Sequence, residues 1–210
     1  MTQKRRGRLF VLSAPSGGGK STLKDRVIHR LPELVYSVSY TTRAPRPGEE
    51  DGRDYNFVSV DHFKEMIDQE QFLEWAEVFG RYYGTGRAWV EEKLDGGQDV
   101  LADLDVVGAS SVRALMPDAV LVFLVPPTAN ELKRRLNLRQ TESVEEAGLR
   151  LSRVRREVGS RGVYDFLIIN DDLDQAVEEL VTIISEGRGR KMADSEYFWP
   201  RFFYDCDESL

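Results

Sequence analysis

A glycine-rich segment near the N-terminus holds the residues whose types and spacing suit phosphate chemistry. It reads Ala14-Pro15-Ser16-Gly17-Gly18-Gly19-Lys20-Ser21-Thr22. The glycines let backbone N–H groups wrap closely around phosphate oxygens, and a helix N-terminus adds partial positive charge. Lys20 can reach the β- and γ-phosphates, and the Ser21 hydroxyl can ligate Mg²⁺. This segment therefore predicts a nucleoside-triphosphate site.

The neighbours of this segment favour a phosphate-binding loop (P-loop) over a chance glycine-rich turn. An apolar run, Leu9–Leu12, precedes it, and a helical pattern over residues 21–31 follows it. A P-loop requires a strand before and a helix after. The usual first glycine of the pattern is Ala14 here, so the strict motif is missed by one methyl group.

A second candidate metal ligand ends another apolar run. Asp103 lies near the end of Val100–Leu104. P-loop proteins place an acidic residue at such a strand end, and Mg²⁺ prefers oxygen ligands. We expect Ser21 and Asp103 to hold Mg²⁺, directly or through water. The alternative is a surface aspartate at a strand end.

Apolar runs alternate with helical patterns along the rest of the chain. Strand-like runs lie at residues 9–12, 100–104, 120–125 and 166–169. Helical patterns lie at residues 21–31, 88–94, 129–138, 144–158 and 173–185. This alternation predicts an α/β fold with a parallel sheet and helices on both of its faces.

Residues 36–87 interrupt the alternation with short β-rich stretches. Turn signals separate these stretches: Pro45, Pro47, Gly48 and Gly52. We expect a small β-rich subdomain here. Within it, Asp61 is expected to be the N-cap of a helix that runs through Ile67, because its carboxylate can accept a free backbone N–H.

Composition limits the class of protein. The chain has 210 residues, is 41% hydrophobic, carries a net charge of −7 and contains one cysteine, Cys206. One domain of this size needs no disulfide, and a lone cysteine cannot form one within the chain. An acidic protein is a poor non-specific binder of nucleic acid. The apolar run after the basic N-terminus is too short for a signal peptide or a membrane span. We expect a cytoplasmic protein that binds neither nucleic acid nor membrane.

Basic residues gather in the C-terminal half of this acidic chain. They are Lys133, Arg134, Arg135, Arg139, Arg150, Arg153, Arg155, Arg156 and Arg161. Such a local density indicates a small, highly charged anion as ligand. A solvated helix face paired with Glu142, Glu145 and Glu146 explains the pattern equally well, so both interpretations stay open.

Seven stretches in order resemble the guanylate kinase family. They are Ser37–Glu49, Gly52–Phe57, Phe72–Ala76, Tyr82–Thr85, Asp103–Asp105, Leu132–Leu136 and Ile169–Asp172. The resemblance covers roughly residues 8–186. It implies a single domain with the three-layer P-loop NTPase fold, a β-rich GMP-binding insert and a helical lid. The implied parts are a core at about 8–35, 88–125 and 165–186, the insert at 36–87, the lid at 126–164 and a tail at 187–210.

The resemblance also implies the reaction, which is transfer of the γ-phosphate of ATP to GMP to give ADP and GDP. Mg²⁺ would accompany ATP. On the donor side, residues 14–22 would bind ATP together with Arg135, Arg139 and Asn170, the last of these near the adenine. The implied catalytic residues are Lys20, Arg43, Arg135 and Arg150. Phosphoryl transfer needs such cations around the transferring oxygens.

On the acceptor side, the resemblance implies that four residues bind the GMP phosphate: Arg43, Arg46, Tyr55 and Tyr83. Guanidinium forks suit a dianionic phosphate because they make paired, charge-assisted hydrogen bonds. For the base, the resemblance assigns the guanine donors to Glu74 with help from Asp105, and guanine O6 to Ser39 and Thr85; Asp103 completes the GMP set. Adenine would present an unprotonated N1 to the carboxylate, which is a costly mismatch.

Two departures from the family pattern and one unusual segment stand out. Gln140 replaces a glycine that usually follows Arg139, and Val107 replaces a common glutamine. The aromatic stretch 197–204 lies beyond the resemblance. Rings are costly to leave in water, so we expect this tail to pack on its own chain or on a partner subunit, as a candidate homo-oligomer contact.

Two alternatives compete with the kinase. One is a guanylate-kinase-like module that binds proteins without catalysis, which the intact Gly19-Lys20-Ser21 and the arginine-rich lid argue against. The other is a kinase of the same fold for a different acceptor, which the combination of Glu74 with Ser39 and Thr85 argues against.

Overall fold

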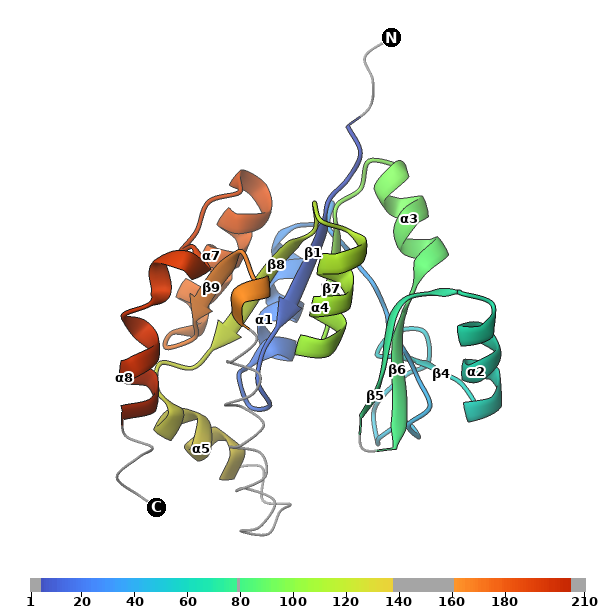
Figure 1. Cartoon of the computed structure of the whole chain (residues 1–210), viewed down its shortest axis with the longest axis horizontal. Helices are drawn as coiled ribbons and strands as arrows, with labels where there is room; N and C mark the ends of the chain where they lie inside the picture. The colour runs from blue at the N-terminus through green and yellow to red at the C-terminus, as the bar shows by residue number, and fades with distance from the viewer. Residues whose placement is uncertain (1–4, 79, 138–160, 205–210) are drawn as a thin grey trace. The chain divides into compact units, whose positions relative to one another are not determined.

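The computed structural model describes residues 5–78, 80–137 and 161–204 (Figure 1). The strands are β1 (Leu9–Ser13), β2 (Val35–Tyr36), β3 (Tyr40–Thr41), β4 (Asn56–Phe57), β5 (Phe72–Val78), β6 (Arg81–Gly86), β7 (Val100–Asp103), β8 (Val120–Val125) and β9 (Phe166–Ile169). The α-helices are α1 (Lys20–Arg30), α2 (Val60–Asp68), α3 (Arg87–Asp95), α4 (Val106–Leu115), α5 (Ala129–Asn137), α7 (Leu173–Glu186) and α8 (Phe198–Tyr204), and the short 3-10 helices are η1 (Arg161–Val163) and η2 (Met192–Ser195). The helix expected at 144–158 lies outside the described residues.

The strands form two sheets. The larger has the order β2-β7-β1-β8-β9, in which the β2–β7 and β8–β9 pairs are parallel. The smaller has the order β4-β3-β6-β5, and β6 pairs antiparallel with both of its neighbours. Together with the helices, the larger sheet confirms the predicted α/β fold.

The chain divides into two compact units. We call Met1–Val11 with Pro32–Val120 the insert unit, and Leu12–Leu31 with Leu121–Leu210 the P-loop unit. No helix in the described ranges combines the length and the apolar character that a bilayer crossing requires.

In the P-loop unit, buried strand β8 pairs residue by residue with β9, from Val122 opposite Phe166 to Val125 opposite Ile169. Helices α1 and α7 are joined by ion pairs, including Arg30 Nη1 to Glu178 Oε1 at 2.8 Å. The Asp172 carboxylate caps α7 by accepting from the backbone N–H of Gln175. These contacts hold the helix that follows the P-loop.

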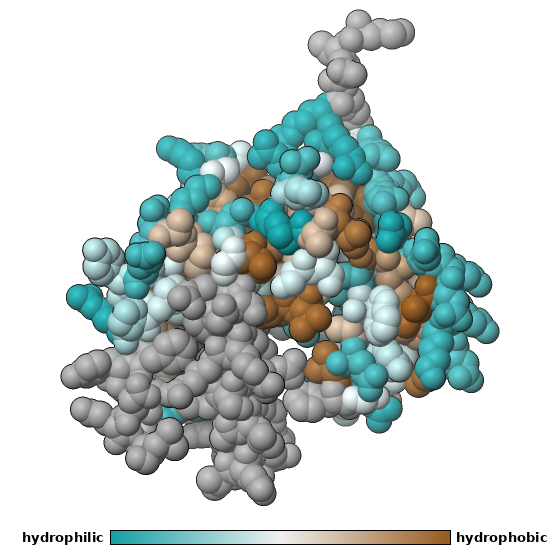
Figure 2. All heavy atoms as spheres, viewed as in Figure 1, coloured by the Kyte–Doolittle hydropathy of each residue, from teal (hydrophilic) through white to brown (hydrophobic). Residues whose placement is uncertain are grey.

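In the insert unit, α2 is amphipathic. Phe63 and Met66 are buried, and the Phe63 ring stacks on Phe72 with centroids 4.4 Å apart. Hydrophilic residues cover the outer surface over α2 (Figure 2). The expectation that Asp61 caps this helix is wrong, because the Ser59 hydroxyl accepts the backbone N–H of His62 at 3.1 Å. Asp61 lies in the first turn instead, where its charge suits the helix dipole.

Helix α4 was not expected from the sequence. Its residues, which include three valines, a glycine and two serines, have no strong helical preference. The Asp105 side chain caps the helix by accepting from Gly108 N at 2.9 Å, and Val106, Ala109 and Val112 are buried. Burial of one face of α4 therefore stabilises the helix more than the intrinsic propensity of its residues does.

The C-terminal tail packs on its own unit, which agrees with the expectation that it packs on its own chain. Leu167 N donates to Arg190 O at 2.9 Å, so the tail covers the edge of β9. Trp199 and Phe202 are buried, and Trp199 Nε1 donates to Ser195 Oγ at 3.0 Å. Tyr197, in contrast, is 88% exposed.

We predict that Phe202→Ala lowers the free energy of unfolding by about 3–5 kcal/mol, because it empties a fully buried ring site. Urea denaturation followed by circular dichroism measures this. Tyr197→Ala is the matched control and should change the value by less than about 0.5 kcal/mol. Equal values for the two variants would contradict a structural role for the tail.

Candidate functional site

The predicted P-loop joins β1 to α1 as the motif requires. Gly17 and Gly19 have φ values of 84° and 94°, a region that glycine enters without strain. Gly18 N donates to Pro15 O at 2.9 Å, which tightens the loop. Lys20 and Ser21 open α1, and in the part of the chain that the structure describes no side chain caps this helix N-terminus. Residues 14–22 thus form one junction suited to an anion.

Asn170, at the end of β9, braces this loop from within the P-loop unit. Its buried amide Nδ2 donates to Gly18 O at 2.9 Å. A Cβ atom at Gly19 would lie only 2.4 Å from the same Nδ2 atom, so a side chain at Gly19 would clash with Asn170. The sequence suggested only a contact with adenine for Asn170. No local sequence signal indicates this bracing contact, because the two residues lie 152 positions apart.

Arg135, on α5, is tied to the same brace. Its Nη2 donates to Asn170 O at 3.0 Å, and its Nε donates to Glu131 Oε1 at 2.7 Å. Hydrogen bonds from Arg134 and from Arg135 lower the pKa of Glu131 to about 2, so this carboxylate stays charged and holds both arginines. Arg139, Gln140 and Arg150 lie outside the described residues.

In the insert unit, three of the residues expected at the GMP phosphate lie together. The Arg43 guanidinium lies 5.3 Å from the centroid of the Tyr55 ring and 5.8 Å from that of Phe57. The Tyr55 and Tyr83 rings are 6.1 Å apart. Burial, followed by the nearby Asp103 charge, raises the pKa of Tyr55 to about 12, so its hydroxyl keeps its proton as a hydrogen-bond donor.

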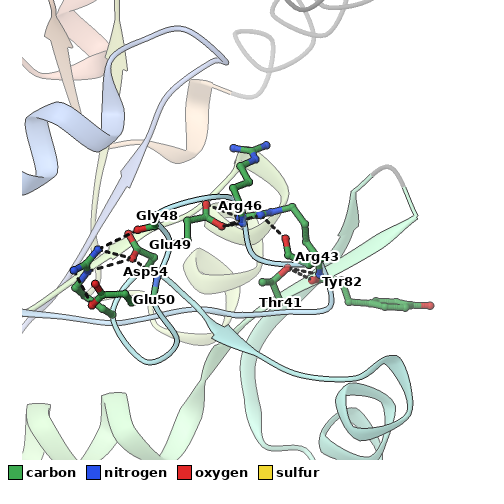
Figure 3. Close-up of polar contacts among 10 residues, drawn as sticks. Thr41, Arg43, Arg46, Gly48, Glu49, Glu50, Asp54 and Tyr82 are labelled. Atoms are coloured by element: carbon green, nitrogen blue, oxygen red, sulfur yellow. Dashed lines mark hydrogen bonds and ion pairs between the residues drawn. The ribbon is translucent and has the colours of Figure 1, made fainter.

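Arg43 also pairs with a carboxylate that the sequence did not single out. Its Nη2 lies 2.8 Å from Glu49 Oε1, and both side chains are mostly buried. Arg46, expected beside Arg43, has an exposed side chain that extends away from this pair (Figure 3). The structure therefore brings Arg43 but not the Arg46 guanidinium into the aromatic cluster.

Glu74 is buried on β5, and two neighbours fix it. Thr85 Oγ1, opposite it on β6, donates to Glu74 Oε1 at 2.6 Å. A Cβ atom at Gly108 would lie 2.5 Å from Glu74 Oε2, so the carboxylate occupies space that only a glycine leaves open. Ser39, the other expected base contact, is also buried in this unit.

Asp103 is the last residue of β7, Asp105 lies just after this strand, and the two carboxylates accept from different donors. Tyr36 Oη donates to Asp103 Oδ1 at 2.7 Å, which orients this carboxylate. Asp105 caps α4 through Gly108 N. Capping fixes Asp105 in a position next to the helix turn that contacts Glu74, a structural role that the sequence pattern did not indicate.

The fold and the P-loop together define a nucleotide-binding protein of the P-loop class. The guanylate kinase family model matches residues 6–187. A guanylate kinase of Shewanella sp. (strain MR-7) is 48% identical over 184 residues, which cover 87% of this chain and 89% of that protein. One from Maricaulis maris (strain MCS10) is 46% identical over 204 residues, covering 97% of this chain and 92% of that protein.

The crystal structure of guanylate kinase from Anaplasma phagocytophilum superimposes with a TM-score of 0.73 at 32% identity and covers 90% of both chains. The chain belongs to the guanylate kinase family. The family membership expected from the seven stretches is thereby confirmed.

We predict that Asn170→Ala raises the KM for ATP about tenfold, because a buried hydrogen bond of roughly 1–3 kcal/mol that braces the P-loop is lost. The KM for GMP should stay within twofold. Steady-state kinetics with each substrate varied measures both constants. The control is Asp171→Ala, a substitution at the exposed neighbouring residue. An unchanged KM for ATP in folded Asn170→Ala would show that the loop does not need this hydrogen bond.

We predict that Gly108→Ala raises the KM for GMP at least tenfold, because the new methyl group displaces the Glu74 carboxylate. Alanine has a higher helix propensity than glycine by about 0.8–1 kcal/mol. The substitution should therefore not weaken helix α4 itself. Ser111→Ala, on the same helix, is the control and should leave the KM unchanged. An unaffected KM in Gly108→Ala would mean that Glu74 need not hold its observed position.

Proposed function

We propose that this member of the guanylate kinase family transfers the γ-phosphate of ATP to GMP, giving ADP and GDP. The observation that carries the proposal is the buried carboxylate of Glu74, held by Thr85 in the same unit as the Arg43 cluster. A buried carboxylate suits the N1–H and N2–H₂ donors of guanine, and family membership supports the same acceptor.

The acceptor site is assigned to the insert unit. Arg43, Tyr55 and Tyr83 would bind the GMP phosphate, and Arg46 would join them through its long side chain. For the base, Glu74 takes the guanine donors, with Asp105 beside it. The Thr85 hydroxyl donates to Glu74 in the absence of ligand. Guanine O6 is assigned to the hydroxyls of Ser39 and Thr85, which rotate to suit their partners.

The donor site is assigned to the P-loop unit. The backbone N–H groups and Lys20 would cradle the ATP phosphates, and Arg135, anchored by Glu131 and Asn170, adds a fixed charge. Arg139 and Arg150 remain proposed contacts of the moving phosphoryl group. The GMP phosphate is itself an anionic nucleophile, so the protein needs to supply placement and cations and no general base.

The donor set fits Mg²⁺. The described residues contain no group of three or more His, Cys, Asp or Glu side chains that could hold a metal alone. Mg²⁺ typically takes one or two protein ligands and fills the rest with substrate phosphates and water. Ser21 would supply a hydroxyl and Asp103 a carboxylate oriented by Tyr36. Bound Mg²⁺ would neutralise charge on the β- and γ-phosphates.

Two further assignments complete the proposal. A cytoplasmic location fits a lone cysteine and soluble nucleotide substrates. The tail rings Trp199 and Phe202 are buried in their own unit, so the structure gives no support to a homo-oligomer built through them.

An assay of ADP release with Mg·ATP and GMP, AMP, CMP or UMP, each offered separately, tests the function. We expect turnover with GMP and at most traces with the others, because the Glu74 carboxylate disfavours bases without a matching donor pair. Equal turnover of GMP and AMP would overturn the assignment of Glu74. A folded protein that binds GMP but turns over none of the four would be a non-catalytic module.

We predict that Lys20→Met lowers kcat at least a hundredfold, because the only full positive charge within residues 14–22 is removed. GMP binding, measured by calorimetry without ATP, should remain within about twofold of the native value. Lys24→Met, one helical turn away, is the control. Loss of GMP binding in Lys20→Met would contradict the separation of donor and acceptor sites.

A further inference from the structure

Glu49 is placed by a turn that its own sequence specifies. Residues Arg46-Pro47-Gly48-Glu49 form a four-residue turn in which Glu49 N donates to Arg46 O at 3.0 Å. Gly48 has φ 88°, and proline followed by such a glycine is the type II pattern. The Glu49 side chain then folds back, and its Oε2 accepts from Arg46 N at 2.7 Å. The turn therefore holds both the backbone and the carboxylate of Glu49.

This fixed carboxylate faces the end of the Arg43 guanidinium (Figure 3). Arg43 Nη1 donates to Glu49 Oε2 at 2.9 Å, and Nη2 donates to Glu49 Oε1 at 2.8 Å. Nη1 also donates to Ala44 O at 2.7 Å. Three of the five N–H groups of Arg43 are thus engaged.

The other two N–H groups of Arg43 form a second fork. They are Nε–H and the second N–H of Nη2, and neither makes a hydrogen bond within the described residues. Both lie on one side edge of the planar guanidinium, a geometry that matches two phosphate oxygens. The faces of the same plane lie near the Tyr55 and Phe57 rings.

We propose that Glu49 is a positioning residue: it holds the end fork of Arg43 so that the side fork is presented to the acceptor phosphate. This inference rests on the proposed function, in which Arg43 binds the phosphate of GMP. Glu49 itself does not touch the substrate. It acts by restricting a long and otherwise flexible side chain, which lowers the entropy lost when the phosphate binds.

The charges and the loop geometry support positioning over competition with the phosphate. The hydrogen bonds from Arg43 lower the pKa of Glu49, and those to Glu49 raise the pKa of Arg43, so both groups are charged at neutral pH. Glu49 is also bound to the backbone of its own turn. It cannot leave Arg43 without giving up that contact, and the side fork makes its departure unnecessary.

Calorimetric titration of Glu49→Gln with GMP and with guanosine tests the proposal. The amide turns an N–H donor toward Arg43, so we expect the Kd for GMP to rise about tenfold. The Kd for guanosine, which lacks the phosphate, should stay within twofold. The matched control is Glu50→Gln, the same change one residue away at a carboxylate that pairs with Arg53 instead. It should leave both constants unchanged.

A second pair of variants shows whether Glu49 acts through Arg43. Arg43→Ala should weaken GMP binding, and adding Glu49→Gln to it should cause no further loss, because the charge to be oriented is gone. In the Arg43→Ala background, Glu49→Gln should leave GMP binding unchanged or make it tighter, since the unpaired Glu49 carboxylate repels phosphate.

The outcomes separate the inference from the function on which it rests. Unchanged GMP binding in Arg43→Ala would overturn the assignment of Arg43 to the phosphate. Weakened binding in Arg43→Ala with unchanged or tighter binding in Glu49→Gln would overturn the positioning role alone, and tighter binding would identify Glu49 as a competitor. An equal loss for GMP and guanosine in Glu49→Gln would reduce Glu49 to a general support of the loop.

Discussion

The charged side chains proposed to bind phosphate are held in place by hydrogen bonds, and this constraint links several parts of the described structure. In the P-loop unit, Asn170 bonds the loop backbone and Arg135 bonds Asn170. In the insert unit, Glu49 holds Arg43. Preorganised charges of this kind need no rearrangement when the substrate binds. Arg43 and Arg135 are therefore each supported by neighbours that are hydrogen-bonded in turn.

The same constraint applies to Glu74, the carboxylate proposed to bind the guanine base. A buried carboxylate is stable only when its hydrogen bonds are satisfied, and Thr85 supplies one to Glu74. Helix α4 approaches the other oxygen closely at Gly108. Asp105 caps that helix and so fixes the turn that carries Gly108. The position of Glu74, the residue proposed to read the base, thus depends on a helix cap as well as on its own strand.

Much of this arrangement could be predicted from local sequence. The P-loop, the alternation of strands and helices, and the β-rich stretches all follow from periodicity and turn residues, and the structure contains them. Helix α4 was missed because its composition favours no helix, and Asp61 was wrongly chosen over Ser59 as a cap. The first error concerns a helix that packing stabilises, whereas in the second both candidates are good caps and the position of the first helical turn favours Ser59.

Local sequence specifies which chemical groups are available and where the chain turns: Lys20 at a helix start, Arg43 before a Pro47-Gly48 turn, and Glu74 in a strand pattern. Which of these groups come into contact depends on how the elements pack. Asn170 reaches Gly18 across 152 positions, and Gly108 comes against Glu74 from another element. No local pattern encodes such contacts, because they arise when distant elements pack and every buried polar group must find a partner.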